Sequence, residues 1–432
     1  MKKILALLGL LLLCVAFVAC GDTDGTVPTE SSACEHANTN WYTKAPTCTK
    51  EGARSGDCPD CGQYISEKLP AKGHEIVDNM CAGCKTYYIN NYDEFLAFAQ
   101  SVNNGNTYSG VKVELLADID LKNQEWTPIG NDTYSFSGVF NGNNHTISNL
   151  LITKNYTYAG LFSRAGGTLK NLNVSGSITT NSFFVGMIAG FASAPSGCSA
   201  TGYITVTERE DTNNKETSIG GAFGRCGDVN SCYSNVQMEV VRTIHLDICV
   251  GGIAGEACWM QGCYSLGDIS VAGYGTNIYV GGIVGKAEAS STEVAIIEEC
   301  FSRGDIVVLA SGTYTPRGYV GGILGYSEAF TETEVTACFV LGDIELKGTP
   351  NTNDCYAGSI AGKYRSNPVV ERCYYSFDHE ISAPNTTRLS EQSTSDKTIF
   401  TADFQKNTLK LSDKWIIDAK GGYPTLAAFA QK

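Results

Sequence analysis

The chain has little positive charge and no cluster of it. Lysine and arginine number 31 against 45 aspartates and glutamates, which leaves a net charge of −14. A surface with this balance is repelled by phosphate backbones and by anionic membrane surfaces. We therefore expect no nucleic-acid partner.

The motifs of common enzyme classes are also missing. The chain contains no Gly-x-Ser-x-Gly, no His-Glu-x-x-His and no phosphate-binding glycine loop. Five histidines occur, of which His145, His245 and His379 lie far apart without a nucleophile motif beside them. We predict that the protein is not an enzyme.

No apolar run reaches the 20 or so residues that a membrane-spanning helix needs. The run from Ile4 to Ala19 comes after Lys2 and Lys3 and ends at Phe17-Val18-Ala19-Cys20, a pattern typical of an export signal. The cysteine after a small residue resembles the bacterial lipoprotein box, although Phe17 stands where leucine is usual. We predict a lipoprotein signal peptide over residues 1–20, with Cys20 lipidated. The alternative is an ordinary secretory signal.

Large apolar side chains are scarce in the next part of the chain. Residues 21–33 are polar and predict a flexible tether. Residues 34–88 are too poor in apolar side chains to fold by core burial alone, so we expect a covalent or metal staple. The candidate ligands are Cys34, His36, Cys48, Cys58, Cys61, His74, Cys81 and Cys84.

Two Cys-x-x-Cys pairs, at 58/61 and 81/84, and two histidines suit two closed tetrahedral zinc sites with a structural role. Disulfides are the alternative, since an exported location favours them. The stretch from Cys58 through Pro70-Ala-Lys-Gly-His74 to Cys84 resembles short repeats of bacterial surface proteins. We predict a zinc-ribbon-like module over residues 34–88.

One helix is predicted before a change of pattern. Asn91 and Glu94 fit a capping box, and Phe95, Phe98, Ala99 and Val102 share one helical face. After Gly105 the chain consists of short apolar runs between Gly and Asn turns, a pattern typical of short strands. We expect the helix, residues 91–103, to cap this β-rich region.

The β-rich region is built from repeats. Val-Gly-Gly-Ile recurs from Val250, Val280 and Val320, and cysteines recur at separations of 34, 31, 37, 38 and 35 residues. Such a period predicts a stacked array of coils in which like residues form columns. The column cysteines are Cys198, Cys232, Cys263, Cys300, Cys338 and Cys373. We interpret them as buried thiols, and a disulfide or metal ladder is the alternative.

The repeats resemble the GLUG-motif proteins, which are bacterial surface adhesins and related cell-wall proteins. The resemblance rests on the cores Gly252-Ile-Ala-Gly255, Gly282-Ile-Val-Gly285 and Gly322-Ile-Leu-Gly325 and on Phe140-Asn-Gly142. It implies an all-β, right-handed parallel β-helix over residues 89–375. We expect residues 376–432, with Trp415 and Tyr423, to close the last coil.

Strand alternation sends the residue after each column cysteine to the opposite face. These neighbours are Tyr233, Tyr264, Phe301, Phe339 and Tyr374. If they face outward they form a row suited to stacking on sugars or to packing a partner; inter-coil stacking is the alternative. Asp268, Asp305 and Asp343 form a further column, a turn feature or a Ca²⁺ site.

We therefore expect a lipid-anchored bacterial surface protein that acts as an adhesin or display rod. Its expected partner is a glycan or a host or matrix protein, bound along a repetitive face. The first alternative is a polysaccharide lyase or hydrolase on a parallel β-helix, which would use clustered carboxylates. The second is a structural envelope spacer.

Overall fold

A computed structural model describes residues 34–208, 216–242, 247–273, 277–289, 292–311, 317–348, 355–366, 368–376, 378–386, 392–394, 401–420 and 424–429. The predicted signal peptide, Cys20, the tether and Tyr423 lie outside these residues. The chain divides into two compact units, with the boundary between Gly73 and His74. Within the described residues, no helix combines the length and apolar character needed to cross a membrane.

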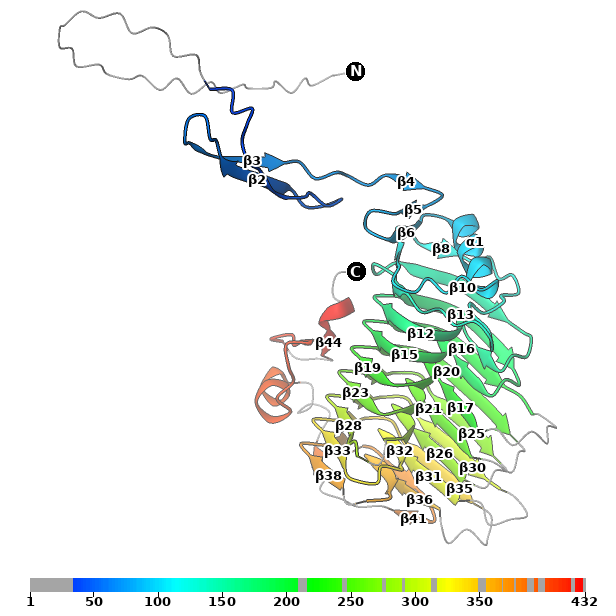
Figure 1. The fold of residues 1–432 in the computed structure, drawn as a ribbon. Coiled ribbons are helices and arrows are strands. Elements are labelled where there is room, and N and C mark those ends of the chain that lie inside the picture. The colour runs from blue at the N-terminus through cyan, green and yellow to red at the C-terminus, as the bar shows by residue number, and fades with distance from the viewer. Residues whose placement is uncertain are drawn as a thin grey trace, which may run out of the picture. The chain divides into compact units, whose positions relative to one another are not determined.

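The first unit is a small antiparallel sheet with almost no core (Figure 1). Its strands, in the order β1-β2-β3, are β1 (Tyr42–Lys44), β2 (Gly52–Asp57) and β3 (Tyr64–Leu69). In residues 34–73 only Thr39, Gly52 and Cys58 are buried. Burial on this scale cannot offset the entropy of ordering about 40 residues. The expectation of a staple therefore agrees with the burial pattern.

The second unit begins with a short antiparallel segment and the predicted helix. These elements are β4 (Ile76–Val77), β5 (Met80–Cys81), β6 (Thr86–Ile89) and α1 (Tyr92–Asn103). The helix is confirmed, and its buried side chains are Phe95, Phe98, Ala99 and Val102. One of the two hydrogen bonds of the predicted capping box is present. Asn91 Oδ1 accepts from the Glu94 N–H at 3.0 Å, but the Glu94 carboxylate accepts from Asn90 N–H rather than reaching Asn91.

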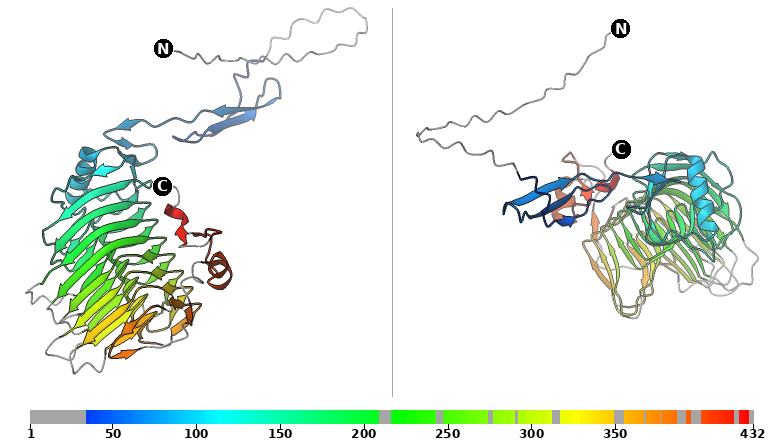
Figure 2. Two further views of the ribbon diagram at one scale, coloured as in Figure 1. Left: turned by 180° about the vertical axis from the view of Figure 1, so that it is seen from behind. Right: turned by 45° about the horizontal axis from the view of Figure 1, so that its top comes forward.

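Parallel sheets make up most of the rest of the second unit (Figures 1 and 2). Sheet 1 has eight strands: β11 (Tyr158–Ala159), β14 (Phe184–Gly186), β17 (Thr217–Gly220), β21 (Ile248–Gly251), β26 (Asn277–Gly281), β31 (Arg317–Gly321), β36 (Tyr356–Gly358) and β41 (Asn385–Thr386). Sheet 2 has fourteen: β8 (Ile119–Asp120), β10 (Thr146–Ile152), β13 (Asn173–Thr180), β16 (Ser199–Val206), β20 (Tyr233–Arg242), β24 (Tyr264–Ser265), β25 (Ile269–Gly273), β29 (Phe301–Ser302), β30 (Ile306–Ala310), β34 (Phe339–Val340), β35 (Ile344–Gly348), β39 (Tyr374–Ser376), β40 (Ile381–Ser382) and β42 (Gln392–Thr394).

Sheet 3 continues from β6. Its strands are β7 (Lys112–Leu115), β9 (Val139–Asn141), β12 (Phe162–Lys170), β15 (Ala189–Ser196), β18 (Phe223–Cys226), β19 (Asp228–Asn230), β22 (Ala254–Ala257), β23 (Trp259–Gln261), β27 (Val284–Ala287), β28 (Ala295–Glu298), β32 (Leu324–Ser327), β33 (Thr333–Thr336), β37 (Ala361–Tyr364) and β38 (Pro368–Glu371). The last described elements are η1 (Phe404–Thr408), β43 (Trp415–Ile416), β44 (Thr425–Leu426) and η2 (Ala427–Phe429).

From β11 onward the chain visits the sheets in a fixed order, sheet 1 then 3 then 2, and each visit adds a strand beside the previous one. The pairing is parallel and in register, so Val250 lies beside Val280 and Val280 beside Val320. The predominantly β fold with parallel sheets is therefore confirmed. The interior holds the apolar residues of all three sheets, as one continuous core.

The two glycines of the Val-Gly-Gly-Ile repeat form the bend from sheet 1 to sheet 3. A Cβ on Gly252 would lie 2.1 Å from the carbonyl oxygen of Gly282, and one on Gly282 would lie 2.1 Å from that of Gly322. Neither glycine has a positive φ. The glycines are therefore required by the close approach of stacked backbones and not by a left-handed conformation.

Candidate functional site

The first candidate is a Cys/His cluster within the first unit. The ligand atoms of Cys34, His36, Cys58 and Cys61 all lie within 4.8 Å of one another. The Cys34 and Cys58 sulfurs are 3.6 Å apart, and Cys61 Sγ lies 3.4 Å from His36 Nδ1. The hydrogen bond with His36 lowers the pKa of the Cys58 thiol to about 6. Three sulfurs and one imidazole nitrogen at this spacing can hold a metal ion.

A second cluster opens the second unit. Cys84 Sγ lies 3.5 Å from His74 Nδ1, and Cys81 is buried beside them. The Tyr88 hydroxyl lies 3.3 Å from the same ring nitrogen. These three predicted ligands are thus brought together. Cys48, the fourth member of the predicted set, is half-buried in the first unit, where its carbonyl accepts from the N–H of Gly73 at 3.1 Å.

The six column cysteines line the interior of the second unit as thiols. Each is at most 1% exposed, and each thiol donates to the carbonyl two residues earlier at 3.3–3.5 Å. None of these six cysteines is in a disulfide. The column therefore acts as small apolar packing with a local hydrogen bond, in agreement with the buried-thiol interpretation.

The aromatic row, Tyr233, Tyr264, Phe301, Phe339 and Tyr374, faces away from this core. Its rings stack with centroid distances of 4.5 Å for Tyr233–Tyr264, 4.9 Å for Tyr264–Phe301 and 4.7 Å for Phe301–Phe339. Phe301 and Phe339 are nevertheless only 1% exposed. The row is therefore not a free surface in this structure.

The cover over the row is the C-terminal part of the chain, residues 401–420 and 424–429, which we call the strap. Trp415 packs on Tyr264 and Phe301 at 5.9 and 5.7 Å, Phe404 meets Tyr374 edge-on, and Phe429 approaches Tyr233. Figures 1 and 2 show this segment, in red, beside the stacked strands. The strap thus packs against aromatic residues of several repeats, from Tyr233 to Tyr374.

Polar contacts fix the strap at defined positions. Ser412 donates through its N–H and its hydroxyl to the Glu299 carboxylate at 3.1 and 2.6 Å, and Arg372 donates to the Leu409 carbonyl at 2.7 Å. Lys414 Nζ donates to Gln261 Oε1. Because these partners lie in different repeats, the strap ties successive coils together.

The aspartate column has a structural use. Asp268 Oδ1 accepts from the Asp305 N–H at 2.9 Å, Asp305 from the Asp343 N–H at 2.9 Å, and Asp343 from the Glu380 N–H at 2.7 Å. One carboxylate oxygen per coil is therefore bonded to the next coil's backbone. This geometry fits the turn interpretation of the column.

A buried charge cluster that draws on sheets 1 and 3 was not predicted. Glu216, Cys249 and Glu256 have ligand atoms within 4.8 Å of one another, but Lys286 Nζ lies 2.9 Å from Glu216 and 2.8 Å from Glu328. An ammonium group already supplies positive charge there. Glu256 is 1% exposed and pairs with Arg225 at 3.2 Å, and burial raises the pKa of its carboxyl group to about 7. A single sequence carries no signal for this cluster, because its members come from four repeats.

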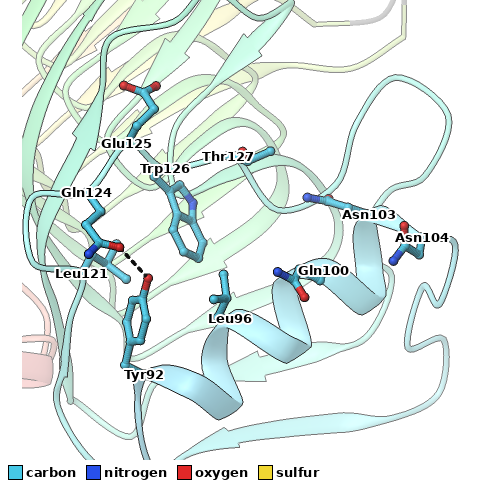
Figure 3. Close-up of a pocket in the computed structure, with 10 residues that line it drawn as sticks. All are labelled: Tyr92, Leu96, Gln100, Asn103, Asn104, Leu121, Gln124, Glu125, Trp126 and Thr127. Carbon is cyan, nitrogen blue, oxygen red and sulfur yellow. Dashed lines mark hydrogen bonds between the residues drawn. The ribbon is translucent and has the colours of Figure 1, made fainter.

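A groove also lies beside α1. Its lining comes from the helix and from residues 121–127, and encloses about 260 Å³ (Figure 3). In Figure 3 the side chains of Leu96 and Trp126 point toward one another, while Glu125 points away. The sequence pattern assigned the helix only a capping role.

Comparison with known proteins adds no relative. No family model, curated protein or solved structure matches this chain.

Proposed function

We propose that this chain is a lipid-anchored bacterial surface protein that binds a ligand without transforming it. The proposal takes the parallel sheets to be a right-handed β-helix of GLUG type, carried on a zinc-stapled N-terminal module. The observation that supports it most is the unbroken in-register pairing of sheet 1 from β11 to β41. Such a scaffold is extended and rigid, as a display rod requires.

The anchor rests on Cys20 and on the resemblance of residues 17–20 to a lipoprotein box. A diacyl anchor supplies the two apolar chains that stable membrane attachment needs. Bacteria fed labelled palmitate are expected to label this chain but not its C20A variant. Equal labelling of both chains would contradict the anchor.

Zinc is the proposed metal of the Cys/His clusters, because soft thiolates and imidazole at tetrahedral spacing suit it. Cys34, His36, Cys58 and Cys61 form one closed set. For the other set we retain Cys48 as the predicted partner of His74, Cys81 and Cys84. Closed sets leave no open coordination position, so the proposed role is structural.

The proposed ligand is a glycan, and its binding is tested by native electrophoresis through gels that contain single polysaccharides. We expect a soluble form beginning at Gly21 to migrate more slowly in at least one gel. Migration at the same rate in every gel would reject glycan binding and would favour a protein partner or an envelope spacer.

A second candidate function, polysaccharide cleavage, is favoured by one observation. Glu256 is buried, has a raised pKa and lines a cavity with Arg225 and Glu288. Glycosidases use a carboxyl group of raised pKa placed near a second carboxylate. A cleared zone in the gel that disappears in Glu256→Gln would favour this function over the binder.

A further inference from the structure

The groove beside α1 lies next to a long stretch without a strand. Between β8 and β9, residues 121–138 pair through isolated β-bridges alone among the described pairings: Glu125 with Leu151, Ile129 with Phe162 and Phe136 with Ala165. A second cavity of about 210 Å³ adjoins the first and shares Asn103 and Thr127 with it. Irregular loops on a rigid scaffold are common positions for binding sites.

The groove is held in one shape by hydrogen bonds. Asn103 accepts from Gly130 N–H at 2.6 Å and donates to the Pro128 carbonyl at 3.1 Å, and Asn131 donates to the Asn103 carbonyl at 3.2 Å. Trp126 is fixed by its N–H bond to the Leu161 carbonyl at 3.0 Å and by stacking on Phe95 at 5.4 Å. A preformed site loses little conformational entropy when a ligand binds.

The floor and the rim of the groove differ in chemistry. Leu96, Leu121 and Trp126 give an apolar floor, and Gln100, Asn104 and Gln124 place amides at the rim. Gln100 and Asn104 are exposed, and their side chains bond to no other residue that the structure describes. Gln124 Oε1 accepts from the Tyr92 hydroxyl at 3.3 Å, which leaves its NH₂ group available.

The charge of the groove selects against anionic ligands. Glu125 is its charged lining residue, and that carboxylate is occupied by the N–H groups of Thr153 and Lys154. Asp132 adds a second negative charge in the adjoining cavity. No basic side chain lines either cavity among the described residues, although Lys122 Nζ lies 4.6 Å from the centroid of the Tyr92 ring. The lining itself therefore offers no counter-ion to a uronic acid or a sulfated sugar.

We propose that this groove binds the terminal residue of a neutral oligosaccharide. A sugar ring presents an apolar C–H face to the Leu96–Trp126 floor and hydroxyl groups to the rim amides, which can both donate and accept. The volume lies below the range of roughly 300–1,000 Å³ found for drug-sized ligands, and so suits one ring rather than a buried chain. This inference rests on the proposed function and names its site and ligand class.

The test measures the binding of neutral and of anionic polysaccharides to the soluble chain, to a double variant of the groove and to a control variant. We expect wild-type retardation by a neutral polysaccharide, and at least a tenfold weaker affinity in Gln100→Ala combined with Asn104→Ala. Both side chains are exposed, so the variant is expected to fold. Ala97→Ser, on an exposed position of the same helix outside the lining, is the matched control and should bind as wild type does.

Three results would overturn the proposed groove or its ligand, and they are distinguishable. Unchanged affinity in the double variant, with wild-type binding intact, would place the ligand elsewhere and leave the proposed function standing. Wild-type retention by anionic polysaccharides alone would reject the ligand class. If the wild type is folded and no polysaccharide retards it, both the proposed sugar site in the groove and the proposed glycan-binding function are rejected.

Discussion

Replacing Trp415 by alanine is expected to detach the strap and destabilise the second unit by about 3 kcal/mol, the lower range for deleting a buried indole. The side chain is 5% exposed and packs on Tyr264 and Phe301. Its N–H has no hydrogen-bond partner among the described residues, so apolar contact holds it. Detachment uncovers the aromatic row. The measurement is limited proteolysis of residues 401–429 together with binding of a fluorescent apolar dye.

Ile416 supplies the matched control, because it is the next residue of β43 and is 47% exposed. Its replacement by alanine should change stability by less than about 0.5 kcal/mol. Similar protease sensitivity and dye binding in the two variants would mean that the strap is not docked through Trp415. The docking of the strap would then rest on its other contacts, such as Phe404 on Tyr374.

Removing metal is expected to unfold residues 34–73 while the parallel sheets remain folded. Residues 34–73 include only three buried residues, and structural zinc sites contribute apparent free energies of about 10–16 kcal/mol to folding at pH 7. Chelation and Cys58→Ser should therefore give the same protease-sensitive module. Zinc binding to this module should weaken as pH falls, because the cysteine thiols and His36 bind a metal only in their deprotonated forms.

Cys258→Ser is the control for loss of a thiol, because Cys258 is half-buried in the second unit and belongs to neither Cys/His cluster. This variant should retain the metal and the folded module. The contradicting result would be a metal analysis that finds no zinc and a mass spectrum that finds the module cysteines paired. The module would then be stapled by disulfides and not by a metal.

Periodicity in the sequence was sufficient to predict the parallel sheets, the helix and the inward direction of the column cysteines. These features depend on the spacing of residue types along the chain, which a single sequence shows directly. Gly252 was also singled out as part of the repeated motif, and the structure shows that close backbone approach, not a positive φ, requires it.

The strap could not be predicted, because alternation shows which face Phe301 occupies but not what covers that face. Trp415 lies more than 100 residues away and has no repeat to place it. The Glu256–Lys286 cluster could not be predicted for a related reason. Which charges of successive repeats are neighbours depends on the strand register, and a single sequence does not show that register.

One conformational feature was missed although it recurs. The residue before each of the six column cysteines has φ between 52° and 62°: Gly197, Ser231, Gly262, Glu299, Ala337 and Arg372. Only two of these are glycine, so the usual marker of a left-handed turn is absent from most of the repeats. Such positions are recognised from backbone geometry.

The central claim is that the protein binds a glycan without cleaving it. The direct test is to incubate the soluble chain with a polysaccharide that retards it and to measure new reducing ends over time. We predict retention with no increase in reducing ends, unchanged by Glu256→Gln. A steady increase that Glu256→Gln abolishes would contradict the account and identify a depolymerase.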